Sequence, residues 1–247
     1  MVSQQPLARV NTPERALACA SIYQLAAVAL GHPLPEFQDA LVEGRFYETF
    51  NKAWYSVTGR EWPKSPVSKD FATLEAGYIA AFTHGKRGKP NINLLAGDYG
   101  SLLEGLSRSI YMLNLQAFYK NFGLKAATTD EGRNEEPDHL VTMLECMVVL
   151  HHLEAQALKR GIDPKAYRLA QRDFLQAYLV PLFETINQKL TSQTNLELDA
   201  TLVRLIEDLP LWLRQQLSEL ETLVGLSAAK LADKVERPAS LAQNLWN

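Results

Sequence analysis

The sequence predicts an all-α protein, a single-domain bundle of roughly nine to eleven helices without a sheet. Apolar residues make up 47% of the 247 residues, enough for one substantial core, and they recur three or four positions apart along most of the chain. Prolines and glycines stand at the starts and ends of these apolar runs, as they do at helix boundaries. No segment alternates apolar and polar residues in the manner of a half-buried strand.

The first predicted helices follow from capping residues and apolar stripes. Thr12 and Pro13 are typical of an N-cap and a first helical position, and Gly31 ends the helix that they begin. A second helical stretch covers 35–55, is interrupted at Gly44, and carries its aromatic residues on one face. The first two helical regions are therefore bounded by ordinary local signals.

Loops and helices alternate in the middle of the chain. Two prolines and a glycine make 56–67 a loop, and Ser68 suits the N-cap of a third helix. The apolar stripe of that helix consists of Phe71, Leu74, Tyr78 and Phe82. The stretch 83–97 is irregular because it holds three glycines and a proline, and a long helix is expected over 101–122, ended by Gly123.

The longest regular apolar pattern lies in the second half of the chain. Pro137 suits the first helical position there, and Glu136 and Asp138 suit the positive end of the helix dipole. Gly161 ends this helix. Its stripe, which we expect to be buried, consists of Leu140, Leu144, Met147 and His151.

Prolines divide the last predicted helices. Apolar residues keep helical spacing over 163–190, where Pro181 bends or breaks the helix. They keep it again over 196–231, where Pro210 marks a boundary between two helices. We therefore expect a bent or broken helix in the first of these stretches and two helices in the second.

The whole chain, 1–247, is expected to form one domain, since apolar residues are spread evenly between the first and the last predicted helix. We expect 1–11 to be a flexible N-terminus and 232–247 a C-terminal extension. The polar stretch 125–135 has almost no apolar residue to anchor it, so we expect it to be mobile and to be the first site of protease cleavage.

Composition excludes several classes of function. The formal net charge is −3 and no stripe of lysine and arginine is present, which argues against nucleic-acid binding. Cys19 and Cys146 lie within apolar helical patterns and are expected to be core residues in a reducing compartment. No stretch reaches the ~18 apolar residues of a membrane span, and no apolar signal segment is visible at the N-terminus. We expect a cytoplasmic protein.

Residues with catalytic potential are few. Glu136 and His139 form the Glu-x-x-His pair of di-iron bundles, but the second pair that such sites need is missing. His151 and His152 point about 100° apart on a helix, so they cannot chelate one metal together. No metal site and no catalytic residue is predicted. The alternative that stays open is an all-α enzyme or metal carrier using Asp138, His139 and His151.

Acidic residues crowd the start of the longest predicted helix, where Glu135, Glu136 and Asp138 stand beside His139. One interpretation is an over-provided N-cap, in which replacing Asp138 costs the fold about 1 kcal/mol at most. The other is an acidic, titratable rim beside an apolar groove, which suits a basic peptide. A third hypothesis is a helical interaction scaffold without a groove, marked by exposed apolar residues elsewhere.

At these residues the chain resembles the TorD/DmsD/NarJ family of redox-enzyme maturation chaperones. Its signature is similar to the run Glu136-Pro137-Asp138-His139-Leu140 at the start of an apolar helix. Tyr178 and Leu182 depart from the family pattern, which often has His and Trp there. The polar insert and the C-terminal extension resemble the maturation subunits of type II enzymes, such as dimethylsulfide dehydrogenase and selenate reductase. Other landmarks in the family's order are Tyr23, Leu25, Tyr78, Phe82, Tyr99, Phe122, Gly123, Phe174, Leu175 and Pro181.

The resemblance implies a system-specific chaperone rather than an enzyme. Such proteins bind the apo catalytic subunit of a DMSO reductase family molybdenum enzyme, its twin-arginine signal peptide, or both, and delay export until the molybdenum cofactor is inserted. No stably bound cofactor is expected, only transient contact with the client's molybdopterin guanine dinucleotide, and the chain should be a monomer or weak homodimer. The expected client-binding residues are Tyr78, Phe82, Tyr99, Glu135, Glu136, Pro137, Asp138, His139 and Leu140.

Overall fold

The computed structural model describes residues 11–84, 89–124, 136–193, 196–228 and 230. The expectations for residues 1–10, for the 125–135 stretch and for the C-terminal extension fall outside this part of the chain. Asn11, the last residue of the N-terminus expected to be flexible, accepts from Arg168 Nη2 at 2.7 Å. The described residues contain no β-strand, only an isolated antiparallel bridge between Leu95 and His139. The all-α prediction is therefore confirmed.

Nine α-helical segments lie within the described residues. A π-helical turn, Leu175–Leu179, joins α7 to α8 without a break, so the segments form eight continuous helices, slightly fewer than predicted. The segments are α1 (Pro13–Leu30), α2 (Pro35–Val42), α3 (Arg45–Thr58), α4 (Phe71–Phe82), α5 (Arg108–Asn121), α6 (Leu140–Lys159), α7 (Lys165–Phe174), α8 (Val180–Thr191) and α9 (Ala200–Val224).

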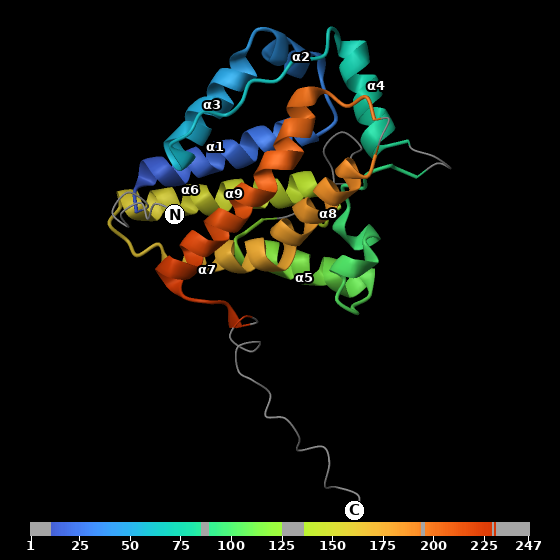
Figure 1. Ribbon diagram of the computed structural model, residues 1–247. Helices are drawn as coiled ribbons and strands as arrows, with labels where there is room; N and C mark the ends of the chain where they lie inside the picture. Colours follow the sequence, from blue (N-terminus) through green and yellow to red (C-terminus); the bar gives the residue numbers. More distant parts are fainter. Residues whose placement is uncertain (1–10, 85–88, 125–135, 194–195, 229, 231–247) are drawn as a thin grey trace, which may run out of the picture.

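The core is organised around α1 and α6, which pack along each other through the middle of the molecule (Figure 1). In this view α2, α3 and α4 lie on one side of the pair, α5 and α7 lie on the other, and α9 crosses in front. The stripe predicted on α6 is buried, as expected, at Leu140, Leu144, Met147 and His151. Burial of such side chains contributes roughly 1.5–3 kcal/mol each, which is why this helix holds the central position.

The N-terminal helices begin and end largely where the sequence predicts. Thr12 Oγ1 accepts from the backbone N–H of Arg15 at 3.2 Å and caps α1. Gly44 separates α2 from α3 with a φ of 79°, which favours glycine. Helix α3 continues to Thr58 and ends at Gly59 (φ 70°), so the expected start of the loop at position 56 was too early.

Helix α4 has a different cap from the predicted one. Asp70 Oδ1 accepts from the backbone N–H of Thr73 at 2.8 Å, so Asp70 and not Ser68 is the N-cap. Ser68 instead donates its backbone N–H and its hydroxyl to Asp199 Oδ2, at 2.6 and 2.7 Å. Asp199 is itself the N-cap of α9, so these bonds tie the start of α4 to the start of α9.

Two further predicted helix boundaries are wrong. The expected helix over 101–122 begins only at Arg108, because Glu104 and Gly105 have positive φ values of 48° and 84° and turn the chain first. Helix α9 runs through Pro210 without a boundary. Leu209 and Leu213 on either side of this proline are buried, so tertiary packing outweighs the lost backbone hydrogen bond.

None of the described helices is by itself long and apolar enough to cross a membrane. Among these helices, only α1 and α2 taken together have the length and composition of a membrane span, and the chain bends by 119° between them. Ten of the eighteen residues of α1 are buried within the protein. Cys19 and Cys146 are both free and buried, as their positions in apolar patterns predicted.

Candidate functional site

The predicted site lies at the junction before α6, where the chain packs against the irregular segment 91–99. The backbone N–H of Ala96 donates to Asp138 O at 3.0 Å, and that of Leu140 donates to Leu94 O at 2.9 Å. These bonds hold the chain extended through His139, so α6 begins at Leu140 and not at Pro137. The expected position of Pro137 as the first helical residue is therefore wrong, because backbone pairing with the 91–99 segment takes the place of a helical turn.

His139 is the N-cap of α6. Its Nδ1 accepts from the backbone N–H of Val141 at 3.2 Å, which requires the proton of a neutral ring to lie on Nε2. Burial lowers the pKa of His139, while the neighbouring Asp138 charge acts in the opposite direction. The neutral ring that the cap needs is thus the form that burial favours.

Asp138 is buried beneath the 91–99 segment and has no exposed surface. Its Oδ2 accepts from the backbone N–H of Gly97 at 2.8 Å. A Cβ atom at Gly97 would lie 2.6 Å from that oxygen, so only glycine allows this approach. The other oxygen, Oδ1, has no hydrogen-bond partner among the described residues. Asp138 therefore fastens the segment to the junction and does not stand on an open rim.

Arg108, the first residue of α5, gathers the acidic residues of the junction. Its Nη1 lies 2.9 Å from Asp98 Oδ1, and its Nη2 donates to Glu136 Oε2 and lies 3.8 Å from Asp138 Oδ2. The side chains of Arg108 and Glu136 are 39% and 44% exposed. We call Arg108, Asp98, Glu136 and Asp138 the Arg108 cluster; it holds three carboxylates around one guanidinium.

The apolar residues of the predicted site do not form an open groove. Tyr78, Phe82 and Leu140 are buried, and the hydroxyl of Tyr78 donates to Leu30 O at 3.1 Å. Tyr99 is half-buried, with its hydroxyl donating to Asn93 O at 2.7 Å inside the 91–99 segment. A client reaches the three buried side chains only if the core packing opens. Glu135 lies outside the described residues.

An exposed apolar surface lies on the outer side of α5 and just before its first turn. Leu106, Ile110 and Leu113 are exposed there, opposite a buried side made by Tyr111 and Leu115. Leu113 is 61% exposed. Ile110 and Leu113, three residues apart, lie on one face of the helix, and Leu106 precedes the N-cap Ser107. The sequence holds a signal for this surface, because apolar residues occur on two faces of the same helix. The expectation of one long helix over 101–122 hid that signal.

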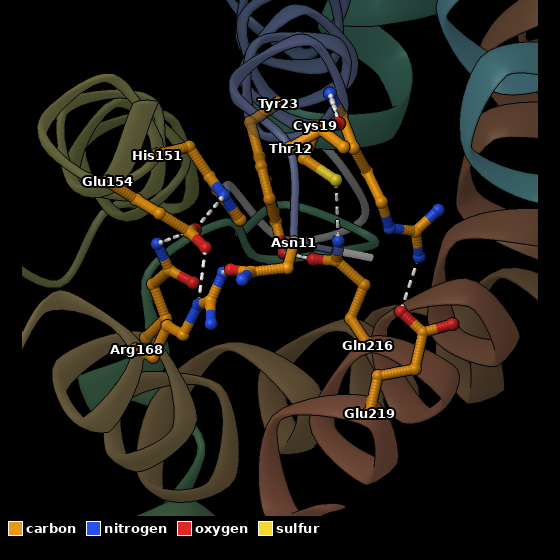
Figure 2. Close-up of polar contacts among 11 residues, drawn as sticks. Asn11, Thr12, Cys19, Tyr23, His151, Glu154, Arg168, Gln216 and Glu219 are labelled. Carbon is orange, nitrogen blue, oxygen red and sulfur yellow. Dashed lines mark hydrogen bonds and ion pairs between the residues drawn. The ribbon is translucent and has the colours of Figure 1, made fainter. Parts of the chain in front are cut away.

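A second polar constellation lies buried between α1, α6, α7 and α9 (Figure 2). Glu154 accepts from Arg168 Nε at 2.6 Å and from Gln171 Nε2 at 2.9 Å, and His151 Nδ1 lies 3.4 Å away. Burial by itself would raise the pKa of Glu154, but the contacts with His151, Gln171 and Arg168 hold it at about 2. The His151 ring stacks on Tyr23 at 5.3 Å between centroids. This network ties core helices together.

The alternative of an enzyme or metal carrier fails on the geometry of its three residues. His151 lies twelve residues after His139, about 18 Å along α6 at 1.5 Å per residue. His151 and His139 therefore belong to separate constellations, and Asp138 lies with His139. Within the described ranges no group of three or more His, Cys, Asp or Glu side chains could hold a metal ion. Burial raises the pKa of the Cys19 thiol to about 12, so this cysteine in the network is not a poised nucleophile.

Comparisons with known proteins place the chain in a family. The family model described as the nitrate reductase delta subunit matches residues 29–187. The dimethyl sulfide dehydrogenase assembly chaperone protein of Rhodovulum sulfidophilum is 46% identical over 233 residues, 94% of this chain and 93% of that protein. The perchlorate reductase assembly chaperone protein of Dechloromonas aromatica is 28% identical over 208 residues, 80% of this chain and 89% of its own.

A third relative, the selenate reductase assembly chaperone protein of Thauera selenatis, is 33% identical over 138 residues, 56% of this chain and 67% of that protein. No solved structure matches the chain significantly. The family model covers well over half of the chain and includes the whole junction before α6. The chain therefore belongs to the nitrate reductase delta subunit family, the TorD/NarJ group whose signature it carries at Glu136–Leu140.

Proposed function

We propose that this protein is the system-specific assembly chaperone of a molybdenum enzyme similar to dimethyl sulfide dehydrogenase. It acts in the cytoplasm, where it binds the apo catalytic subunit and keeps it from export until the cofactor is in place. The observation that carries this proposal is the 46% identity to a dimethyl sulfide dehydrogenase assembly chaperone over 94% of the chain. The relatives named above are assembly chaperones and not catalysts, so no turnover is assigned.

The client-binding surface in this proposal combines the Arg108 cluster with the outer face of α5. The cluster carries more carboxylates than guanidiniums, which suits a basic segment of the client, such as the twin-arginine part of a signal peptide. The apolar side chains of Leu106, Ile110 and Leu113 suit the hydrophobic stretch that follows such arginines. The Arg108 cluster and the apolar face of α5 thus supply the two chemistries that the groove predicted from sequence was expected to combine.

Contact with the client's molybdenum cofactor is proposed to be transient, with the pterin held by the client. The chaperone alone is proposed to be a monomer or a weak homodimer. Both proposals follow from the function of holding an unfinished subunit, which must be released once it is complete. Mass measurement of the purified protein and of its client complex tests both.

Co-purification tests the function directly. The tagged chain is expressed with the apo catalytic subunit of its own molybdenum enzyme, and we expect the two to elute together. Leu113→Asp should reduce the recovered client at least five-fold without lowering the melting temperature, because this side chain is 61% exposed and supports little of the core. The matched control is Leu211→Asp on α9, which removes an equally apolar side chain that is 74% exposed.

The control fixes the interpretation of this experiment. Equal losses for both substitutions would mean that exposed apolar surface in general, and not the α5 face, holds the client. If Leu113→Asp recovers as much client as the wild type, the outer face of α5 is not part of the binding surface. Failure of the wild-type chain to retain the apo subunit at all would contradict the proposed function.

A further inference from the structure

We propose that Arg108 occupies, within the protein itself, the position that an arginine of the client takes, so that the two guanidiniums compete for the same carboxylates. The inference rests on the proposed function, since it concerns how a basic client segment binds. It assigns to Arg108 a role in setting affinity, which the family signature before α6 does not include. The observations that support it are the composition, the contacts and the accessibility of the Arg108 cluster.

The cluster is not saturated by its own arginine. Arg108 makes one contact with each of Asp98, Glu136 and Asp138 and grips none of them with two parallel hydrogen bonds. Two parallel bonds to a single carboxylate are the strongest arrangement open to a guanidinium. Three carboxylates around one guanidinium leave two formal negative charges without a cation among the described residues. Asp98 Oδ2 also accepts from Asn93 Nδ2, so the acceptor capacity for a further guanidinium lies at Glu136 and at Asp138 Oδ1.

Asp138 supplies an independent sign of an unfilled interaction. Its side chain is fully buried, yet Oδ1 has no hydrogen-bond partner among the described residues. A buried carboxylate oxygen without a donor is costly, so this atom favours the approach of a donor. The Nε of Arg108 is also buried without a partner. The pairing between these two residues is thus incomplete on both sides, as expected of a contact that another group can replace.

Accessibility determines how the replacement takes place. Asp138 has no exposed surface, and the cation it faces is Arg108, whose side chain is 39% exposed. An incoming guanidinium therefore approaches Asp138 along the path that Arg108 fills, and the half-exposed Arg108 side chain, whose Nε is buried, has to move outward to admit it. Ion pairs as exposed as those of Arg108 with Asp98 and Glu136 contribute little to stability, so displacement is inexpensive for the fold.

Competition of this kind lowers the apparent affinity for the client in proportion to the fraction of molecules whose site is occupied by Arg108. Removal of the Arg108 charge should therefore have two effects of opposite sign. Binding of an arginine-bearing peptide becomes tighter, because its competitor is gone, while the melting temperature falls, because Asp138 loses its neighbouring cation. A purely structural Arg108 would lower both quantities together.

The test compares Arg108→Met with the wild type in binding a fluorescent peptide that carries two adjacent arginines followed by a short apolar stretch. We expect the dissociation constant of Arg108→Met to fall by about five-fold or more, and its melting temperature to fall by about a degree at most. The same peptide with two lysines should gain less, because an ammonium cannot bind a carboxylate through two parallel bonds. Arg108→Lys keeps a cation but not the guanidinium, so its dissociation constant and its melting temperature should also fall, but by less than those of Arg108→Met.

Arg45→Met is the matched control, since it removes the same charge from an exposed ion pair with Glu43 at a remote site. Equal tightening by Arg45→Met would show a general effect of net charge and would overturn the inference. Unchanged or weaker binding by Arg108→Met would also overturn it. If that variant does not fold, the same result with Arg108→Lys decides the question.

The outcome for the whole client separates this inference from the proposed function. If neither protein binds the arginine peptide but the wild-type chain still co-purifies with the apo subunit, the competition is disproved and the chaperone function stands. If the subunit is not retained either, the proposed function itself fails.

Discussion

Replacement of Asp138 by alanine tests whether this residue is a structural fastener or a client contact. The side chain has no exposed surface, and its Oδ2 accepts from the backbone N–H of Gly97 at 2.8 Å. Alanine leaves that N–H without its charged acceptor, which costs about 1.5–3 kcal/mol. The 3.8 Å contact with Arg108 is long and Arg108 is partly exposed, so its loss adds at most a few tenths.

The expected total is a loss of about 2 kcal/mol in the free energy of unfolding, which lowers the melting temperature by roughly 4–8 °C for a chain of this size. This is more than the cost of about 1 kcal/mol at most expected from sequence, where Asp138 was taken for part of an exposed cap. The assay is urea unfolding, read as a shift of the midpoint with an unchanged slope.

Two comparison variants make the result decisive. Asp70→Ala removes the exposed N-cap of α4 and should have a smaller effect. Asp138→Asn keeps an oxygen that can accept from Gly97 and should retain most of the stability lost in Asp138→Ala. A free energy of unfolding of Asp138→Ala within about 0.5 kcal/mol of wild type, or an equal loss with Asn and Ala, would refute the reasoning from burial.

The remaining predictions concern binding, pH dependence and packing. Glu136→Gln should weaken binding of the arginine peptide at low salt with little change in melting temperature, because Glu136 is 44% exposed; a large fall in melting temperature would contradict this. The pKa of Glu154 is about 2 in the folded protein against about 4.5 for the free side chain, so its contribution to stability is present above pH 4.5 and is lost as the pH falls towards 2. Glu154→Gln should flatten the dependence of the urea midpoint on pH in that window, and an unchanged slope would disprove the assignment. Gly77→Ala should destabilise the fold by about 1–3 kcal/mol, since the new Cβ would lie 2.3 Å from the carbonyl oxygen of Glu197; a wild-type melting temperature would show that the chain relaxes there.

Local signals explain which parts of the fold were predictable. The start of α1 at Thr12 and Pro13 depends on residues within one turn, and the sequence identifies it correctly. The buried stripe of α6 also follows from spacing along one helix. Where two local signals compete, tertiary contacts decide. Ser68 is a suitable cap, but Asp199, which lies 131 residues later in the chain, binds it instead.

In the candidate site, too, the sequence predicts what neighbouring residues determine and misses what tertiary contacts determine. The sequence brings Glu136, Asp138 and His139 together because they are neighbours in the chain, and the structure confirms that they share one junction. The sequence does not show that Arg108 pairs with these residues, since Arg108 and Glu136 are 28 residues apart in the chain. Nor does local spacing reveal that Asp138 is buried under Gly97, 41 residues earlier in the chain.

The sequence by itself determined the helical class, the position of the signature and the family, because periodicity, capping and motif order are properties of neighbouring residues. Only the tertiary structure decided which carboxylates are open to a partner and which are used by the fold. That decision depends on long-range packing of the 91–99 segment and of α5 against the junction, where burial turns Asp138 into a fastener and leaves Glu136 and the outer face of α5 exposed. Burial of a charged side chain such as Asp138 depends on the whole packed chain, and the local pattern around it does not encode it.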